Sequence, residues 1–203
     1  MTAQAAHATK TTLPLSATLS GTRSTAWWAM VILILNEAVV FASLLASYFY
    51  LRFNSVLWPP QGVRLPELTF SSINTLLLIG SSIVMQWAVN SVRQDHVGRL
   101  RVGLAVAFLM GAAFLGIQIY EYTQLGFLPQ EHAYGSLFWS ITGLHALHVL
   151  AGLLMNAYIQ VRAAYGHFSI DRHQAVENVS LYWHFVDIVW LFIFASLFLS
   201  PYL

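Results

Sequence analysis

Residues 181–190 read LYWHFVDIVW and lie inside the last long apolar run of the chain. A helix through this stretch places Trp183, Asp187 and Trp190 on one face, with His184 beside Asp187. If the run crosses a membrane, a carboxylate and an imidazole near its middle are too costly to turn toward lipid. The stretch therefore predicts a helix whose polar and aromatic face meets other helices of a bundle.

The composition is typical of an integral membrane protein. Of the 203 residues, 58% are hydrophobic and 8% are charged, whereas soluble domains carry roughly 25% charged residues. The net charge of +1 gives no indication of a nucleic-acid partner. The chain contains no cysteine, so it offers no disulfide, thiolate metal ligand or thiol nucleophile of its own.

Five apolar runs follow a polar tail. Residues 1–24 are rich in Ala, Thr and Ser and lack the continuous apolar core of a signal peptide, so we interpret them as a cytoplasmic tail. Each later run approaches the ~20 residues that cross ~30 Å of hydrocarbon. For residues 25–203 we predict an all-α membrane protein, a bundle of five transmembrane helices at about 26–51, 68–92, 101–124, 136–161 and 178–200.

The distribution of Lys and Arg predicts the orientation of the bundle. With five spans, the tail and the loops near 93–101 and 162–177 share one side of the membrane, and the other side holds Arg52 and Arg64. Because short loops rich in Lys and Arg stay in the cytoplasm, we expect a cytoplasmic N-terminus and an external C-terminus. The residues on the basic side are Lys10, Arg23, Arg93, Arg99, Arg101, Arg162 and Arg172.

Several polar residues interrupt the apolar runs. Glu37 lies about a dozen residues into the first run, which at ~1.5 Å per residue places it near the middle of the bilayer. His145 and His148 in the fourth run and His184 and Asp187 in the fifth lie at similar depths. We expect these five residues to form one polar cluster joined by inter-helix hydrogen bonds. For Glu37, a tie between helices, a proton-relay group and a lipid or partner contact all remain open.

The histidines do not form a recognisable metal site. A metal ion needs three or four ligands, and neither a Glu-x-x-His pair nor a Cys supplies the ligands that His145 and His148 would lack. A haem held by two histidines has no distinguishing pattern here either. We therefore expect no metal ligand and no catalytic residue in this chain. Glu121, near the outer end of the third run, is expected to extend to the membrane interface.

The segment from Tyr182 to Phe192 resembles the Tyr-Trp-His-Phe-Val-Asp-x-Val-Trp-Leu-Phe signature of subunit III of haem-copper oxidases. The resemblance covers about residues 27–200, and several spaced motifs in one order make it specific. The other matching segments, in chain order, are Glu37 with Phe41, Trp58-Pro59-Pro60, Asn74-Thr75, Gln118 with Glu121-Tyr122, Tyr134-Gly135-Ser136 and residues 142–148, which read TGLHALH.

The resemblance implies a non-catalytic subunit of an aa3-type terminal oxidase of aerobic respiration, in a bacterial cytoplasmic (inner) membrane. Such a subunit carries no haem or copper, which belong to partner subunits. It packs against the catalytic subunit I, in a complex that also contains subunit II, binds phospholipid in a cleft and helps to sustain proton uptake. By the same resemblance, Glu37 matches the family's carbodiimide-reactive carboxylate, and Arg162 and His167 match positions associated with phospholipid head groups.

The chain departs from the seven-helix form of the family. That form has two more helices before the one that carries Glu37, where this sequence has a polar tail, so one arm of the lipid cleft would come from another chain or be absent. Trp58-Pro59-Pro60 and Glu37 look more like the cytochrome c branch of the family than the quinol branch. Subunit III of a quinol oxidase remains an alternative, as does a free-standing membrane enzyme or carrier that uses the polar cluster.

Overall fold

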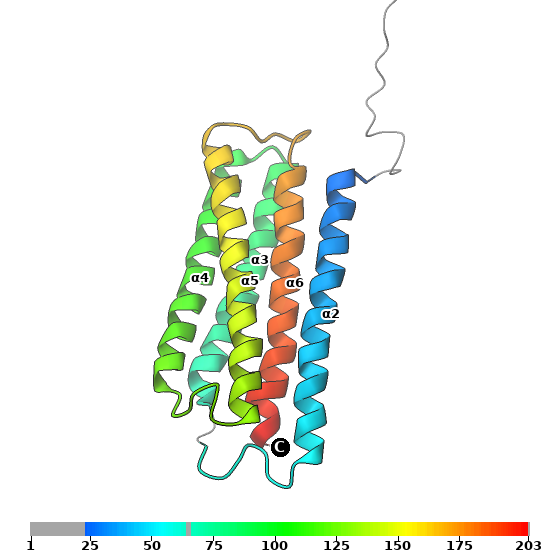
Figure 1. The fold of residues 1–203 in the computed structure, drawn as a ribbon. Coiled ribbons are helices and arrows are strands. Elements are labelled where there is room, and N and C mark those ends of the chain that lie inside the picture. The colour runs from blue at the N-terminus through cyan, green and yellow to red at the C-terminus, as the bar shows by residue number, and fades with distance from the viewer. Residues whose placement is uncertain (1–22, 64–65, 203) are drawn as a thin grey trace, which may run out of the picture.

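Five long helices make up the computed structural model, which describes residues 23–63 and 66–202 (Figure 1). The polar tail up to residue 22, with Lys10, and the loop residue Arg64 lie outside the described residues. The helices are α2 (Thr25–Asn54), α3 (Leu68–Arg93), α4 (Val97–Gln124), α5 (Ala133–Ala164) and α6 (Gln174–Ile193), and α6 continues into the π-helical η1 (Phe194–Leu199) and the 3-10 turn η2 (Ser200–Tyr202).

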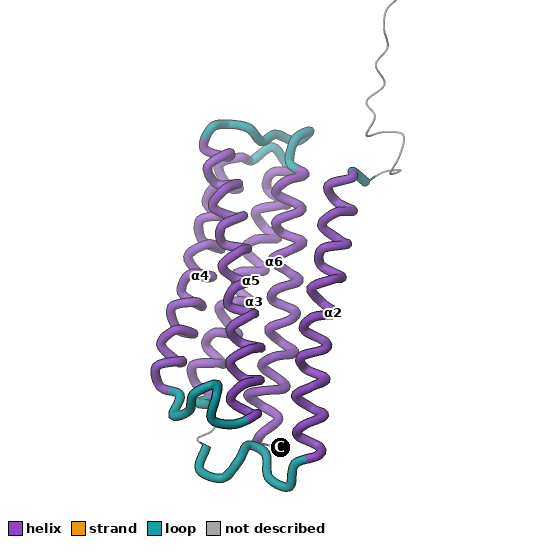
Figure 2. Tube along the Cα trace, viewed as in Figure 1, coloured by secondary structure: helices purple, strands orange, loops and turns teal. Residues whose placement is uncertain are grey.

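The five predicted spans are confirmed. Each helix is long and apolar enough to cross a membrane, and loops connect the helices at both ends of the bundle (Figure 2). Several helices extend beyond the predicted runs, since α4 begins at Val97 and α6 begins at Gln174. Hydropathy detects the apolar middle of a span, whereas a helix continues until its last backbone groups find other partners.

Side chains cap several helix ends. Ser24 caps α2, and the Nδ1 atom of His132 accepts a hydrogen bond of 2.7 Å from the backbone N–H of Gly135 at the start of α5. At the far end of α5, the guanidinium of Arg101 donates to the carbonyl of Ala163 at 3.0 Å. These contacts satisfy backbone groups that the helices themselves leave without partners.

Helix α2 lies at the side of a bundle formed by α3, α4, α5 and α6 (Figure 1). It packs mainly against α6 and α5, and among its 30 residues Phe41 and Tyr48 are buried. The antiparallel pair α3 and α4 shares the most extensive contact of the bundle. Many large apolar side chains face outward on every helix, as expected where the surrounding solvent is lipid.

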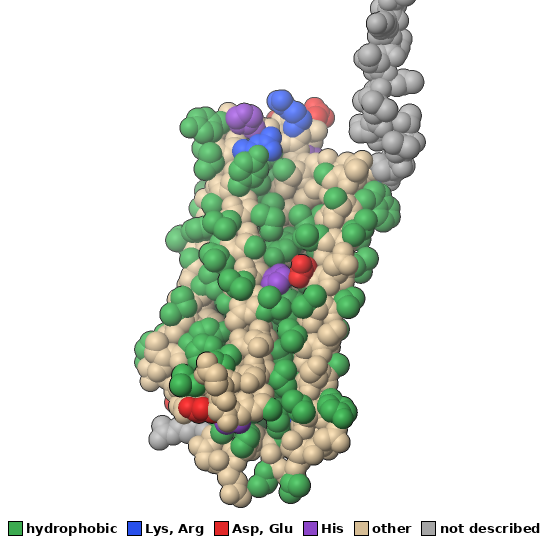
Figure 3. All heavy atoms as spheres, viewed as in Figure 1, with side chains coloured by type: hydrophobic (Ala, Val, Ile, Leu, Met, Phe, Trp, Pro, Cys, Tyr) green, Lys and Arg blue, Asp and Glu red, His purple; other side chains and the backbone are tan. Residues whose placement is uncertain are grey.

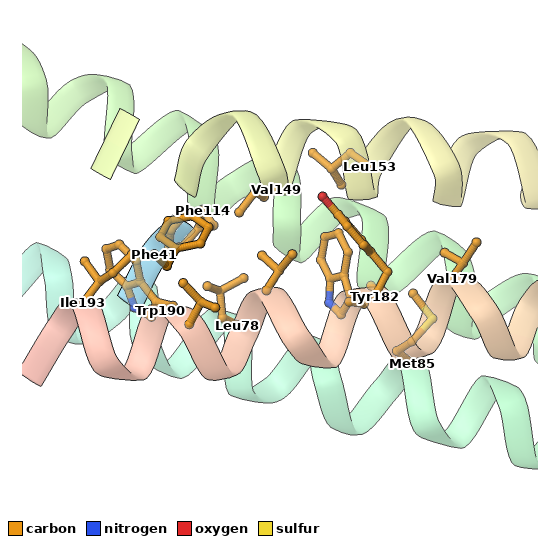
Figure 4. Close-up of a cluster of buried hydrophobic side chains, with 14 of the residues drawn as sticks. Phe41, Leu78, Met85, Phe114, Val149, Leu153, Val179, Tyr182, Trp190 and Ile193 are labelled. Atoms are coloured by element: carbon orange, nitrogen blue, oxygen red, sulfur yellow. The ribbon is translucent and has the colours of Figure 1, made fainter. Parts of the chain in front are cut away.

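The aromatic face predicted for the last helix is buried. Trp183 and Trp190 have no exposed surface, and each indole N–H donates to a hydroxyl of α3, at 2.9 Å to Ser81 and 3.0 Å to Thr75. Figure 4 shows Trp190 beside aromatic rings from α2 and α4 in the core. Buried indoles are stable in such a core when their N–H groups are paired.

Basic residues collect at one end of the bundle (Figure 3). The described arginines lie at the α2 N-terminus, in the helix turns on either side of the α3–α4 connection and around the α5–α6 loop, with the exception of Arg52 at the opposite end. The charge segregation predicted from the sequence is thus present among the described residues. Which side of the membrane this end occupies stays a prediction.

Candidate functional site

Helices α2 and α5 bring Glu37 and His148 together at mid-height of the bundle. Glu37 Oε2 lies 3.0 Å from His148 Nε2, and His148 Nδ1 lies 2.8 Å from the carbonyl oxygen of Leu144. Because a carbonyl oxygen can only accept, the contact with Leu144 assigns a ring proton to Nδ1, and Nε2 faces the Glu37 carboxyl. The contact joins α2 to α5 at a depth where lipid offers no hydrogen bonds.

The Glu37–His148 pair lines a cavity of about 400 Å³ between α2 and α5. The Glu37 side chain is 33% exposed and that of His148 12%, so the carboxyl is reached more easily from outside the bundle. Figure 3 shows an acidic and a histidine side chain side by side at mid-height of this mostly hydrophobic face. The remaining lining residues are Leu33, Leu147, Ala151, Met155 and Tyr182.

His145 lies one turn away from His148 but has a different environment. It is fully buried among the rings of Trp190, Phe114 and Phe41, whose centroids lie 5.1, 5.7 and 6.2 Å from its own. Neither ring nitrogen of His145 has a hydrogen-bond partner among the described residues. His145 therefore packs as an aromatic ring and does not extend the Glu37–His148 pair.

His184 and Asp187 lie on the seam between α6 and α3, where Ser82 bridges them. His184 Nδ1 is 2.7 Å from Ser82 Oγ, and that hydroxyl donates to Asp187 Oδ2. No direct hydrogen bond joins the two residues in the described chain. The role of Ser82 could not be predicted from the sequence, because a single serine in an apolar helix has no spacing that distinguishes it from a packing residue.

The structure places the five predicted cluster residues in separate environments. Glu37 and His148 meet between α2 and α5, His184 and Asp187 face α3, and His145 lies in the aromatic core. Counting residues along a helix predicts depth, but three residues correspond to a rotation of roughly 60° around the axis. Neighbouring polar residues at the same depth can therefore face different helices.

Glu121 also differs from the sequence expectation. Its side chain is 3% exposed and does not extend to the interface. The hydroxyl of Ser71 donates to Oε1 at 2.9 Å, and the amide of Gln118 lies 3.5 Å from Oε2. These hydrogen bonds tie α4 to α3 and to its own preceding turn, which explains why the carboxyl stays inside. Within residues 23–63 and 66–202, no three His, Asp or Glu side chains are grouped as metal ligands would be.

Arg162 and His167 lie together at the end of α5. His167 Nδ1 is 3.3 Å from the carbonyl oxygen of Arg162, and the Arg162 guanidinium lies over the rings of Phe168 and Tyr158, at 5.3 and 5.7 Å from their centroids. Among the described residues, no carboxylate lies within ion-pair distance of Arg162. The aromatic rings hold the cation in place while leaving it able to meet an anion.

Comparison with known proteins supports the resemblance found in the sequence. The family model described as cytochrome c oxidase subunit III matches residues 12–201. The chain is 35% identical to cytochrome c oxidase subunit 3 of Thermostichus vulcanus over 171 residues, which cover 84% of this chain and 85% of that one. The chain is 34% identical to subunit 3 of Synechocystis sp. over 173 residues, which cover 85% of this chain and 74% of that one. It is 32% identical to subunit 3 of Drosophila melanogaster over 177 residues, which cover 84% of this chain and 68% of that one. The chain therefore belongs to the cytochrome c oxidase subunit III family.

Proposed function

We propose that this chain is the non-catalytic subunit III of an aa3-type cytochrome c oxidase, with haem and copper held by its partner subunits. It supports dioxygen reduction by stabilising subunit I and its proton entrance and by keeping phospholipid between the two. The observation that carries the proposal is the Glu37–His148 pair, which joins α2 to α5 beside an apolar cavity open toward lipid. Family membership implies further oxidase subunits, and subunits I and II are the proposed partners.

The cavity and the end of α5 together suit one phospholipid. Leu33, Leu147, Ala151 and Met155 offer an apolar wall for an acyl chain. Arg162 lies 14 residues beyond His148, which is about 21 Å along the helix and roughly 40° around it. The Arg162 cation is therefore on nearly the same face as the cavity, at a depth where a phosphate head group lies.

The proposed role of Glu37 is tested with Glu37→Gln in the whole oxidase. The amide keeps the side-chain volume, so we expect an unchanged haem spectrum, loss of carbodiimide labelling and faster inactivation during turnover. Glu131→Gln is the matched control, because Glu131 is exposed in the loop before α5. A loss of haem signals in Glu37→Gln, or inactivation no faster than in the control, would contradict the proposal.

Purification of the untreated complex separates this proposal from a free-standing enzyme or carrier. An accessory subunit should co-purify with larger haem- and copper-bearing chains, which a mass-spectrometric inventory identifies. The chain purified alone should show neither a haem spectrum nor stoichiometric metal. Either signal in the isolated chain would overturn the assignment.

A further inference from the structure

A row of polar side chains follows the α3–α6 seam, and part of it faces outward. Ser82, Gln86 and Asn90 lie at i, i+4 and i+8 on one face of α3. Gln86 and Asn90 are exposed, and Ser82 and His184 of α6 are half-buried. We call these four residues, together with Asp187, the seam row.

Polar contacts connect the seam row from the bilayer middle toward the basic end. Beyond the Ser82 bridge described above, His184 Nε2 lies 3.2 Å from both Ser180 Oγ and Gln86 Oε1, and the Gln86 amide donates to Asn90 Oδ1 at 3.2 Å. One turn further, Arg93 and Glu177 form an ion pair of 2.6 Å between the ends of the same two helices. The row therefore forms one chain of contacting polar groups.

The depth of the seam row makes its exposure costly. Arg93 ends α3 at the basic end, and at ~1.5 Å per residue Asn90, Gln86 and Ser82 lie about 5, 10 and 16 Å below it. At least Gln86 and Ser82 therefore lie within the hydrocarbon region of a span about 30 Å thick. Lipid chains offer no hydrogen bonds to groups at that depth.

The row has hydrogen-bonding capacity that the described chain does not use. A primary amide has two N–H donors, and the described residues give the Gln86 amide one acceptor and the Asn90 amide none. Asp187 Oδ1 is buried and also has no hydrogen-bond partner among the described residues. The neighbouring outward residues Ile83 and Trp87 are apolar, so they cannot supply acceptors.

The exposed polar residues of α2 behave differently. Asn36, Ser43 and Ser47 each donate to a carbonyl of their own helix four residues earlier, at 3.0, 2.8 and 2.9 Å. Each of these side chains therefore has a partner within its own helix, whereas the Asn90 amide has no acceptor among the described residues. The contrast distinguishes Gln86 and Asn90, the exposed amides of α3, from these exposed polar residues in the middle of α2.

We propose that the face around Gln86 and Asn90 is the docking surface for a transmembrane helix of another oxidase subunit. That helix would present hydrogen-bond acceptors, the oxygens of Ser, Thr, Asn or Gln side chains, at the depth of the two amides. The inference rests on the proposed function, because it requires a partner subunit, and it deepens that function by assigning the face that the partner covers.

Photo-crosslinking in the assembled oxidase tests the proposed face. Ile83 is 67% exposed beside Gln86, and Leu154 is 65% exposed on α5 at a similar distance from the basic end. With benzoylphenylalanine at position 83 we expect an adduct with another oxidase subunit, identified by mass spectrometry, and at position 154 an adduct with lipid. Lipid adducts alone at position 83, or a dimer of this chain, would overturn the inference.

Loss of the amides tests their contribution to binding. Each hydrogen bond within a membrane raises an association constant about threefold. The double variant Gln86→Leu, Asn90→Leu should therefore lower the amount of this chain retained in detergent-washed oxidase by about tenfold. The double variant Asn36→Leu, Ser43→Leu is the matched control, and its retention should equal that of the unsubstituted chain. Equal retention of the two double variants would contradict the interface. If the unsubstituted chain fails to co-purify with haem-bearing subunits, the proposed function itself is lost.

Discussion

At the scale of single residues, Trp183 depends on two glycines. A Cβ added at Gly152 would lie 2.8 Å from two ring carbons of Trp183, and one added at Gly111 would lie 2.6 Å from a third. The indole, also bonded to Ser81, has no room to move aside. We expect Gly152→Ala to lower the free energy of unfolding by about 1 to 3 kcal/mol, as overpacking of a core does, in a denaturant titration in detergent micelles.

Gly116→Ala is the control for this prediction. A Cβ at Gly116 meets no atom within 4 Å, and alanine is the better helix former by about 0.5 to 1 kcal/mol. Gly116→Ala should therefore be neutral or stabilising. If both alanine variants lose the same stability, the close packing of the indole is not the cause.

The sequence predicted which face of the last helix is buried, but not the partners of that face. The spacing of Trp183, Asp187 and Trp190 was sufficient to place them inside. Their hydroxyl partners on α3 could not be predicted, because apolar runs of equal length do not specify which helices adjoin or how they are rotated. For the same reason the depth of His145 was predictable and its aromatic surroundings were not.

At the scale of helices, α2 is the most apolar of the five spans and the least buried. In a membrane, high hydropathy and low burial can occur in the same helix, because lipid accepts an apolar helix face as readily as a protein core does. Hydropathy therefore predicted that α2 exists but gave no indication that it lies at the side of the bundle. Its attachment depends on a few specific contacts, of which the Glu37–His148 pair is one.

Arg52 provides a second attachment for α2, at the end opposite the basic loops. Its guanidinium donates to the carbonyl of Ser200 at 2.7 Å and also to the hydroxyl of the same residue. We expect Arg52→Met to lower the free energy of local opening by about 1 kcal/mol. This change corresponds to roughly fivefold faster deuterium exchange in residues 55–63. Mass-spectrometric hydrogen exchange measures this, with Arg99→Met as control because Arg99 is exposed and makes no side-chain hydrogen bond to a described residue. Equal exchange in both variants would show that Arg52 does not hold α2.

At the scale of the whole molecule, the segregation of charge predicts how the bundle is inserted. The described arginines other than Arg52 occupy the end formed by the α3–α4 turn and the α5–α6 loop. Because basic loops are retained in the cytoplasm, the loop between α2 and α3 should face outward. The absence of cysteine from the chain makes this easy to test, since the unsubstituted protein offers no thiol to label.

Single cysteines in two exposed loops give opposite expectations. Gln61 lies between α2 and α3, and Ile170 lies between α5 and α6, and both are exposed. A membrane-impermeant maleimide should label Gln61→Cys in intact cells and Ile170→Cys after permeabilisation alone. Labelling of Ile170→Cys in intact cells, with Gln61→Cys protected, would reverse the orientation. It would also place Arg162 and the head group proposed to bind it in the outer leaflet, so the same experiment decides which leaflet supplies the lipid.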